Sequence, residues 1–189
     1  MLLTNKEQVR AKALSLRKEA SQNQTEAASL LAARFLALFP PCPDLIIGGY
    51  WPLGSEIDIK PILYHYHQAQ VPVALPISNS QEILGFYPWR PGTALQTGVN
   101  LAQEPIICES AILPNLLILP LVAFDRRGQR LGRGGGYYDR LLDKLRKASF
   151  SFISVGVGFA VQEMMEIPVL AHDQALDWVI SEKESIKCG

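Results

Sequence analysis

The chain has 189 residues, of which 48% are hydrophobic, and its 18 Lys and Arg residues balance its 18 Asp and Glu residues. This length and composition are typical of one globular domain, so we expect residues 1–189 to fold as a single unit. The zero net charge excludes a strong overall attraction to nucleic acid or anionic lipid, so any anion-binding site must be local.

Two amphipathic helices are expected at the start of the chain. In residues 5–20 and again in residues 25–39, apolar side chains recur at spacings of three and four, the period of one helix face. Thr25 is placed to cap the second helix, and the prolines from Pro40 onward end it. The expected apolar faces are Val9, Ala13, Leu16 and Ala20 in the first helix and Ala28, Leu31, Phe35 and Leu38 in the second.

The rest of the chain alternates apolar runs with helical segments. Strands are expected over residues 44–50, 71–76, 83–89, 115–124, 152–159 and 175–180, and a loop over residues 90–115. Helices are expected over residues 59–68, with Pro61 in the first turn, and 137–147, with Tyr138, Leu141, Leu142 and Leu145 on one face. This alternation predicts an α/β fold: a three-layer α/β/α arrangement with a mostly parallel, Rossmann-like sheet.

Ligands of such sheets bind beyond the carboxyl ends of the strands. Two segments are therefore of interest. Residues 49–58, "GYWPLGSEID", follow the first expected strand, and residues 125–139, "DRRGQRLGRGGGYYD", follow the best candidate for a central strand.

The second of these segments predicts a polyphosphate site. Glycines allow the backbone N–H groups to approach an anion closely, and the N-terminus of the following helix adds positive charge. Arg130 and Arg133 can bind phosphate oxygens, and Asp139 can hold a magnesium ion. The segment is neither a Walker A loop nor a G-x-G-x-x-G motif, because Tyr137 stands at the last required position. The alternative is a solvated turn between a strand and a helix.

Other candidates are weaker alone. Trp51 and Glu56 can stack on a heteroaromatic ring and accept its N–H groups, or they are a partly exposed tryptophan and a solvated acid. Lys6 and Arg10 share a helix face and can clamp phosphates, or they belong to a solvated basic face. Asp173 is a second metal carboxylate or part of a loop. We find no Ser-His-Asp or Cys-His arrangement.

The motifs resemble a known family. Residues 119–142, "LPLVAFDRRGQRLGRGGGYYDRLL", resemble the signature of the 5-formyltetrahydrofolate cyclo-ligases. The segments "KEQVR", "YWPLGSEIDIKPI", "QEP", "GFAVQ" and "AHDQALDWVI" resemble further family motifs in the right order, so the resemblance covers nearly the whole chain. Leu121 stands where many members have glycine, Asn115 where aspartate is common, and Gly135 where some members carry lysine.

The resemblance implies an enzyme that uses ATP and Mg²⁺ to convert 5-formyltetrahydrofolate to 5,10-methenyltetrahydrofolate, ADP and phosphate. The formyl oxygen takes the γ-phosphoryl group, and nitrogen 10 then attacks the activated carbon. Phosphoryl transfer depends on positioning and charge neutralisation, which agrees with the lack of a triad. Two alternatives remain: a kinase or ligase that acts on another acceptor, and a folate- or nucleotide-binding protein without turnover.

The resemblance also implies site residues. Arg133 and Tyr137 are implied to be catalytic, and Asp139 and Asp173 are implied to bind the metal. The residues implied to bind ATP are Lys6, Arg10, Arg130, Leu131, Gly132, Arg133, Gly134, Gly135, Gly136, Tyr137 and Tyr138. The residues implied to bind the folate are Trp51, Glu56, Arg133, Gly134, Gly135, Gly136 and Tyr137.

We expect the protein to be a cytoplasmic monomer that binds small molecules and neither nucleic acid nor membrane. The start of the chain has no apolar signal core, and the longest apolar run, residues 116–124, is too short to cross a bilayer. Cys42, Cys108 and Cys188 are too widely spaced to indicate a disulfide framework or a zinc site.

Overall fold

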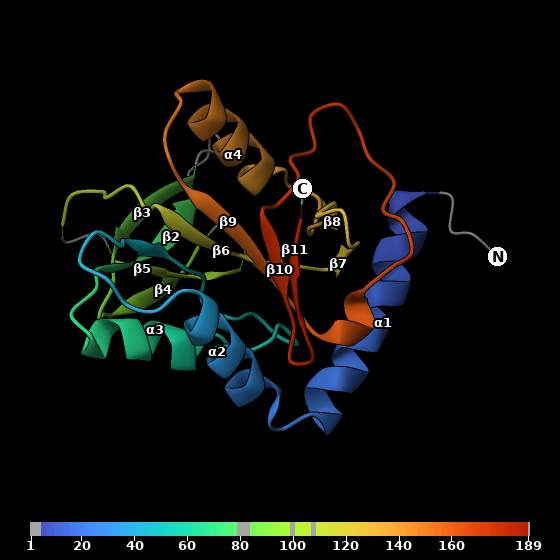
Figure 1. Ribbon diagram of the computed structural model, residues 1–189, viewed down its shortest axis with the longest axis horizontal. Helices are drawn as coiled ribbons and strands as arrows, with labels where there is room; N and C mark the ends of the chain where they lie inside the picture. Colours follow the sequence, from blue (N-terminus) through green and yellow to red (C-terminus); the bar gives the residue numbers. More distant parts are fainter. Residues whose placement is uncertain (1–4, 79–83, 99–100, 107–108, 189) are drawn as a thin grey trace.

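A computed structural model describes residues 5–78, 84–98, 101–106 and 109–188. Its centre is a seven-stranded sheet in the order β11-β10-β9-β6-β1-β2-β3 (Figure 1). Five strands are mutually parallel, and β3 and β11 are antiparallel at the two edges. The bounds are β1 (Ile47–Gly48), β2 (Val73–Ser78), β3 (Leu84–Pro88), β6 (Leu116–Pro120), β9 (Ile153–Val157), β10 (Trp178–Ile180) and β11 (Ser185–Lys187).

Helices cover both faces of the sheet, which confirms the predicted three-layer α/β fold (Figure 1). The residues of β6 alternate between the faces: Leu116 and Ile118 pack toward α2 and α3, and Leu117 and Leu119 toward α4. Such burial on both faces explains why β6 is uniformly apolar. The helix bounds are α2 (Ala27–Leu38), α3 (Lys60–Gln68) and α4 (Tyr137–Lys147).

Helix α1 (Lys6–Asn23) lies at one end of the molecule, beside the small hairpin of β7 (Ala123–Phe124) and β8 (Arg130–Leu131) (Figure 1). The side chain of Asn5 caps α1 by accepting a hydrogen bond from the N–H of Gln8 at 2.9 Å. Apolar side chains at the start of the helix pack against the hairpin. Among the described helices, none is long and apolar enough to span a bilayer.

The apolar face of α1 differs from the predicted one. Val9, Ala13 and Ala20 are buried as expected, but Leu16 is only half-buried and Arg17 takes the fourth buried position. The spacing of four residues from Ala13 to Arg17 suits the helix period as well as the spacing of three to Leu16. Polar partners inside the protein, described below, allow the arginine to lie there.

Helix α2 also differs in detail. Its first residue follows Glu26, and no side chain caps it, so the expected Thr25 cap is wrong. The buried face starts at Ala27 and ends at Phe35, while Leu38 is exposed. Helix α2 is rich in alanine and leucine, which favour helix without a cap. Helix α3 begins with Pro61 in its first turn, as predicted.

The apolar run at residues 115–124 forms two strands instead of one. Strand β6 ends at Pro120, and the chain then leaves the sheet. The carbonyls of Leu121 and Val122 accept hydrogen bonds from the side-chain amide of Gln162, and the N–H of Val122 bonds to Leu131. These hydrogen bonds to Gln162 and to the hairpin replace the hydrogen bonds that a neighbouring sheet strand would make. The partners lie outside residues 115–124, so the apolar run does not predict them.

Four short strands were not predicted. Residues 90–115 contain β4 (Leu95–Thr97) and β5 (Gln103–Pro105), which pair with each other, β8 pairs with β7, and β11 pairs with β10 at the sheet edge. Strands of two or three residues are too short to show a period, so only their pairing partners define them. Residue 83 of the strand expected over 83–89 and residues 99–100 and 107–108 of the expected loop lie outside the described residues, as does Cys108. Among the described cysteines, Cys42 and Cys188 are free thiols.

The connections reverse direction between β1 and β6. The chain passes from β1 through α3 to β2 on one side, and from β6 through α4 to β9 on the other. Loops that leave β1 and β6 therefore separate at their carboxyl ends and form a crevice, the usual ligand position in this architecture. Tyr50 and Trp51 follow β1 at this point, and Leu121 follows β6.

Candidate active site

A cavity of about 530 Å³ occupies this crevice. It also receives the start of α1, the end of β2 and the segment before β10. All residues that the sequence analysis assigned to a site line this cavity: Lys6, Arg10, Trp51, Glu56, Arg130, Leu131, Gly132, Arg133, Gly134, Gly135, Gly136, Tyr137, Tyr138, Asp139 and Asp173.

Only part of the predicted glycine-rich segment reaches the cavity. Residues 125–129 form the turn of the hairpin between β7 and β8, where the buried Asp125 accepts the N–H groups of Arg127 and Gln129. Residues 132–136, the glycine loop, follow β8 and lead into α4. The predicted loop after the central strand is therefore reached through a hairpin.

The glycines of this loop have different reasons to be glycine. Gly134 and Gly136 have φ angles of +110° and +66°, which other residues rarely adopt. A Cβ on Gly135 would lie 2.5 Å from the ring of Tyr137, so a lysine at this position would require the ring to move. Gly132 has neither constraint, because nothing lies within 4 Å of its would-be Cβ. Its bare backbone leaves space for a ligand.

Helix α1 supplies two cations to the loop side of the cavity. Arg10 donates a hydrogen bond from Nε to the carbonyl of Gly132 at 3.0 Å. Lys6 forms an ion pair with Asp173. Burial raises the pKa of Asp173, whereas Lys6 and the N–H of Leu170 lower it. The lowering effects together are larger, so the pKa lies below its ordinary value.

Arg130 and Asp139 form a second ion pair. Arg130 Nη2 lies 2.9 Å from Asp139 Oδ1, and the guanidinium also donates to the carbonyl of Gln174. The Arg130 side chain is only 6% exposed, and burial lowers its pKa although Asp139 acts in the opposite direction. Of Arg130 and Arg133, the two arginines that the glycine-rich segment offers to phosphate, Arg133 is therefore the accessible one, with 47% of its side chain exposed.

The two predicted metal carboxylates are neighbours. Asp139 Oδ1 accepts the N–H of Gln174, the residue after Asp173, at 3.0 Å. Among the described residues, no group of three or more His, Cys, Asp and Glu side chains could hold a metal ion. Two carboxylates nevertheless fit Mg²⁺, which is commonly held by one or two carboxylates and completes its shell with water and substrate phosphates.

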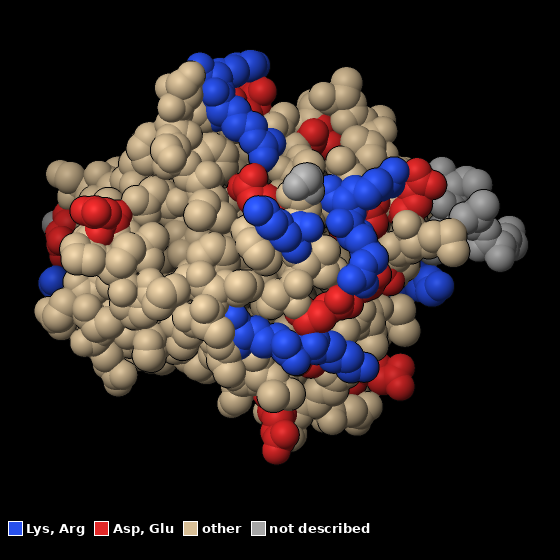
Figure 2. Space-filling view, viewed as in Figure 1, with Lys and Arg blue, Asp and Glu red and all other residues tan. Residues whose placement is uncertain are grey.

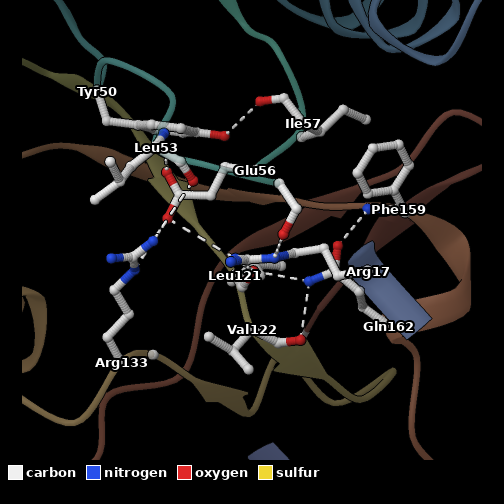
Figure 3. Close-up of polar contacts among 12 residues, drawn as sticks. Arg17, Tyr50, Leu53, Glu56, Ile57, Leu121, Val122, Arg133, Phe159 and Gln162 are labelled. Carbon is white, nitrogen blue, oxygen red and sulfur yellow. Dashed lines mark hydrogen bonds and ion pairs between the residues drawn. The ribbon is translucent and has the colours of Figure 1, made fainter. Parts of the chain in front are cut away.

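Glu56 lies in the cavity wall next to Arg133 of the glycine loop (Figure 3), and its side chain is buried, with 7% of it exposed. Its Oε1 lies 3.3 Å from Arg133 Nε and 3.8 Å from Arg17 Nη1, and its Oε2 accepts the N–H of Leu53 at 2.9 Å. This burial excludes the alternative of a solvated acid. It places a carboxylate with two cationic partners in the wall of the cavity.

Aromatic side chains also line the cavity. Trp51 is half-buried, with its ring 5.9 Å from that of Trp89 and 5.5 Å from Lys60 Nζ. Tyr50 is buried and donates its hydroxyl to the carbonyl of Ile57 at 3.1 Å. Burial and the nearby Glu56 carboxylate raise the pKa of the Tyr50 and Tyr138 hydroxyls, which keeps both protonated.

Several residues in and behind the cavity wall were not predicted from the sequence. Glu104 is buried on β5 and accepts hydrogen bonds from the N–H and hydroxyl of Ser78 at 3.0 and 2.7 Å. A Cβ on Gly98 would overlap the Glu104 carboxylate, so another residue there would require this carboxylate to move. The only sequence signal was the Glu104-Pro105 pair. Tyr50, which lines the cavity, lies next to an apolar run, and Arg17, which lies behind the wall, is on the apolar face of α1. Neither residue stands out in the sequence.

Comparison with known proteins gives the family. The model of the 5-formyltetrahydrofolate cyclo-ligase family matches residues 3–182. The chain is 30% identical over 166 residues to the 5-formyltetrahydrofolate cyclo-ligase of Escherichia coli, covering 85% of this chain and 90% of that protein. It is 32% identical over 133 residues to the enzyme of that name from Haemophilus influenzae, covering 67% and 70%.

A solved structure supports the same assignment. The NMR structure of the Aquifex aeolicus 5,10-methenyltetrahydrofolate synthetase has a TM-score of 0.72 and 26% identity, over 96% of this chain and 91% of that one. The sequence match over nearly the whole chain and the shared fold agree with the motifs around the cavity. The chain belongs to the 5-formyltetrahydrofolate cyclo-ligase family.

Proposed function

We propose that this protein converts 5-formyltetrahydrofolate and ATP to 5,10-methenyltetrahydrofolate, ADP and phosphate. Membership of the cyclo-ligase family supports the reaction. The observation that carries the proposal for the site is the convergence on one cavity of α1, the loop after β1, the glycine loop and residue 173. These segments are far apart in the chain, and each contributes a charged group suited to one part of the two substrates.

The ATP phosphates are assigned to the glycine loop. Its backbone N–H groups and the N-terminus of α4 favour an anion. Lys6, Arg10 and Arg133 add cations at the cavity wall. Lys6 and Arg133 are at present paired with carboxylates, and phosphate oxygens would compete with those partners.

The reaction proceeds in two steps. The formyl oxygen on nitrogen 5 attacks the γ-phosphorus, and the bond to the ADP oxygen breaks. Nitrogen 10 then attacks the activated formyl carbon and loses its proton, and the C–O bond breaks to release phosphate. Arg133 of the glycine loop is the residue that contacts Glu56, and Tyr137 follows the loop as the first residue of α4. Both line the cavity, where they can neutralise and orient the group in transfer.

Asp139 and Asp173 are the residues that we propose hold Mg²⁺. When bound there, the ion would neutralise part of the phosphate charge during transfer. Lys6 would then share the carboxylate of Asp173 with the ion, and phosphate oxygens would supply it with a further partner.

The folate ring is assigned to the Glu56 end. A buried carboxylate is suited to the amino and ring N–H donors of a pterin, and Trp51 can stack on its face. Both residues follow β1 at the switch point of the sheet.

The proposed activity is tested with purified protein, Mg²⁺, ATP and 5-formyltetrahydrofolate. We expect the near-ultraviolet absorbance of the methenyl product to appear together with ADP, and neither to appear when ATP or the folate is omitted. Consumption of ATP without the methenyl product would favour a kinase or ligase acting on another acceptor. Folate binding without turnover by the folded protein would favour a sequestering protein.

We further propose that residues 1–189 form one domain and that the protein is a cytoplasmic monomer with small-molecule substrates. The balanced net charge supports the absence of nucleic-acid and membrane partners. On the face shown in Figure 2, basic side chains lie among acidic ones, and the part over α3 is mostly uncharged. Sedimentation at several concentrations tests the monomer.

A further inference from the structure

We propose that Arg17 is a positioning residue for folate binding, which holds the carboxylate of Glu56 in place from behind the cavity wall. The inference rests on the proposed role of Glu56 in binding the folate. Neither the motifs nor the assigned site residues include Arg17.

The position of Arg17 on α1 is unusual. It shares the buried face of the helix with Val9, Ala13 and Ala20, where an apolar residue would continue the pattern, and it is only 3% exposed. Burying a guanidinium costs free energy unless hydrogen bonds and a counter-ion compensate it. Replacement of a buried ion pair by apolar side chains is often neutral or stabilising. Stability alone therefore does not explain why an arginine occupies this position.

The contacts of Arg17 all lead to the cavity wall (Figure 3). Its Nε donates to Ser55 Oγ at 3.1 Å, and its Nη1 donates to the carbonyl of Leu121 at 3.4 Å. The same Nη1 lies 3.8 Å from Glu56 Oε1. Arg17 thus contacts Glu56, the residue before it and the first residue after β6, on both sides of the switch point.

Gln162 makes the base of this arrangement rigid. It is fully buried, and its Nε2 donates to the carbonyls of Leu121 and Val122 at 2.8 and 2.9 Å. Its Oε1 accepts the N–H of Phe159 at 2.7 Å (Figure 3). The carbonyl that orients Arg17 is therefore itself fixed by a second element.

The two arginines beside Glu56 are not equivalent. Arg133 belongs to the glycine loop, is about half exposed and is assigned to the transferring phosphoryl group. Arg17 is buried in α1 and has no route to the phosphates that does not break its own contacts. When Arg133 turns toward the phosphates, Arg17 and the N–H of Leu53 remain to hold the carboxylate of Glu56. The folate then meets a carboxylate in one orientation.

A double-mutant cycle tests this inference. Glu56→Gln alone is expected to raise the KM for 5-formyltetrahydrofolate roughly ten- to a hundredfold, because a charge-assisted hydrogen bond is lost. Arg17→Met alone is expected to raise it about tenfold and to leave the KM for ATP unchanged, because Glu56 loses its fixed partner. In the Glu56→Gln background, Arg17→Met is expected to add less than about twofold, because its target is gone.

Two further variants complete the cycle. Lys18→Met, an exposed neighbour on the same helix, is the matched control and is expected to leave both KM values unchanged. Arg17→Lys keeps the charge without the planar fork, and we expect its folate KM to lie between those of the wild type and Arg17→Met. Circular dichroism reports the folded fraction of each variant. If Arg17→Met does not fold, Arg17→Lys takes its place in the cycle, with an expected rise of about threefold that disappears in the Glu56→Gln background.

The outcomes separate the two proposals. A Glu56→Gln variant with an unchanged folate KM shows that the folate assignment of Glu56 is wrong, and the role of Arg17 is lost with it. A raised folate KM for Glu56→Gln, together with an equal effect of the Arg17 variant in both backgrounds, overturns the role of Arg17 alone. A parallel rise in the KM for ATP also overturns it, because Arg17 would then act on the whole cavity.

Discussion

The charges assigned to the two substrates contact one another across the cavity. Lys6 pairs with Asp173 and Arg133 with Glu56, so these two cations predicted to bind phosphate are held beside a predicted ligand of the metal or the folate. The desolvation of these groups is therefore largely compensated before substrates bind. When ATP, Mg²⁺ and folate bind, their charged groups must replace these ion-pair partners. A residue that forms an ion pair within the protein and also contacts a substrate should therefore affect both binding and stability when it is substituted.

Asp139 is such a residue, and its substitution has two expected effects. Asp139→Asn should weaken the Mg²⁺ dependence of turnover, and it should lower the free energy of unfolding by about 1–3 kcal/mol because the buried Arg130 loses a charged acceptor. A magnesium titration and urea unfolding measure the two effects.

Asp143→Asn is the matched control for this test. Asp143 lies on the same helix, pairs with Lys147 and is not part of the cavity wall, so its substitution should change neither measurement. An Asp139→Asn protein with a wild-type magnesium titration would show that Asp139 does not hold the metal.

At the scale of elements, the glycine loop combines two requirements that look identical in sequence. Gly134 and Gly136 allow left-handed backbone between β8 and α4, while Gly132 leaves space at the cavity. Gly136 stands at the N-cap of α4 without a side-chain hydrogen bond, so the first N–H groups of the helix have no capping side chain there. The loop thus serves the fold at one end and the ligand at the other.

This difference predicts opposite results for two alanine substitutions. Gly136→Ala should lower the free energy of unfolding by about 1–2 kcal/mol, because alanine is strained at positive φ. Gly132→Ala should change stability by less than about 0.5 kcal/mol but raise the KM for ATP about tenfold, because its methyl group occupies the space of the phosphates. Thermal unfolding and steady-state kinetics distinguish them. A Gly132→Ala protein with an unchanged KM for ATP would mean that the phosphates lie elsewhere.

For the whole molecule, ion pairs between distant segments predict the response to acid. Lys6 on α1 holds Asp173, and Arg126 after β7 holds Glu184 before β11. Both carboxyls have a pKa below their ordinary values of 3.8 and 4.5, because these cations favour the charged form. Their contribution to stability is present above the ordinary pKa and is lost as the pH falls through the lowered one.

We therefore expect the free energy of unfolding to fall as the pH is lowered below about 4.5. Asp173→Asn should reduce the slope of this fall, because asparagine does not titrate. Denaturant unfolding of both proteins at a series of acidic pH values measures the slopes. Equal slopes would show that the pair of Lys6 and Asp173 does not contribute to the acid response.

Much of the architecture was present in local patterns. The helix periods of α1 and α4, the apolar run of β6 and the turn proline of α3 each depend on residues close in the chain, so the sequence alone predicted these elements and the parallel sheet that they build. The order of motifs around the glycine loop likewise predicted the family, because it depends on residue types and their spacing.

Only the tertiary structure decided which groups become partners. The carbonyl of Leu121, just after β6, is satisfied by the amide of Gln162, about forty residues later, and β4, β5 and β11 exist because a neighbouring strand satisfies their backbone. The burial of Glu56 and the place of Arg17 on an apolar helix face follow from contacts across the switch point between β1 and β6. A hydrogen bond or ion pair between distant residues leaves no period in the sequence, because its free energy depends on a distance that exists only after the chain has folded.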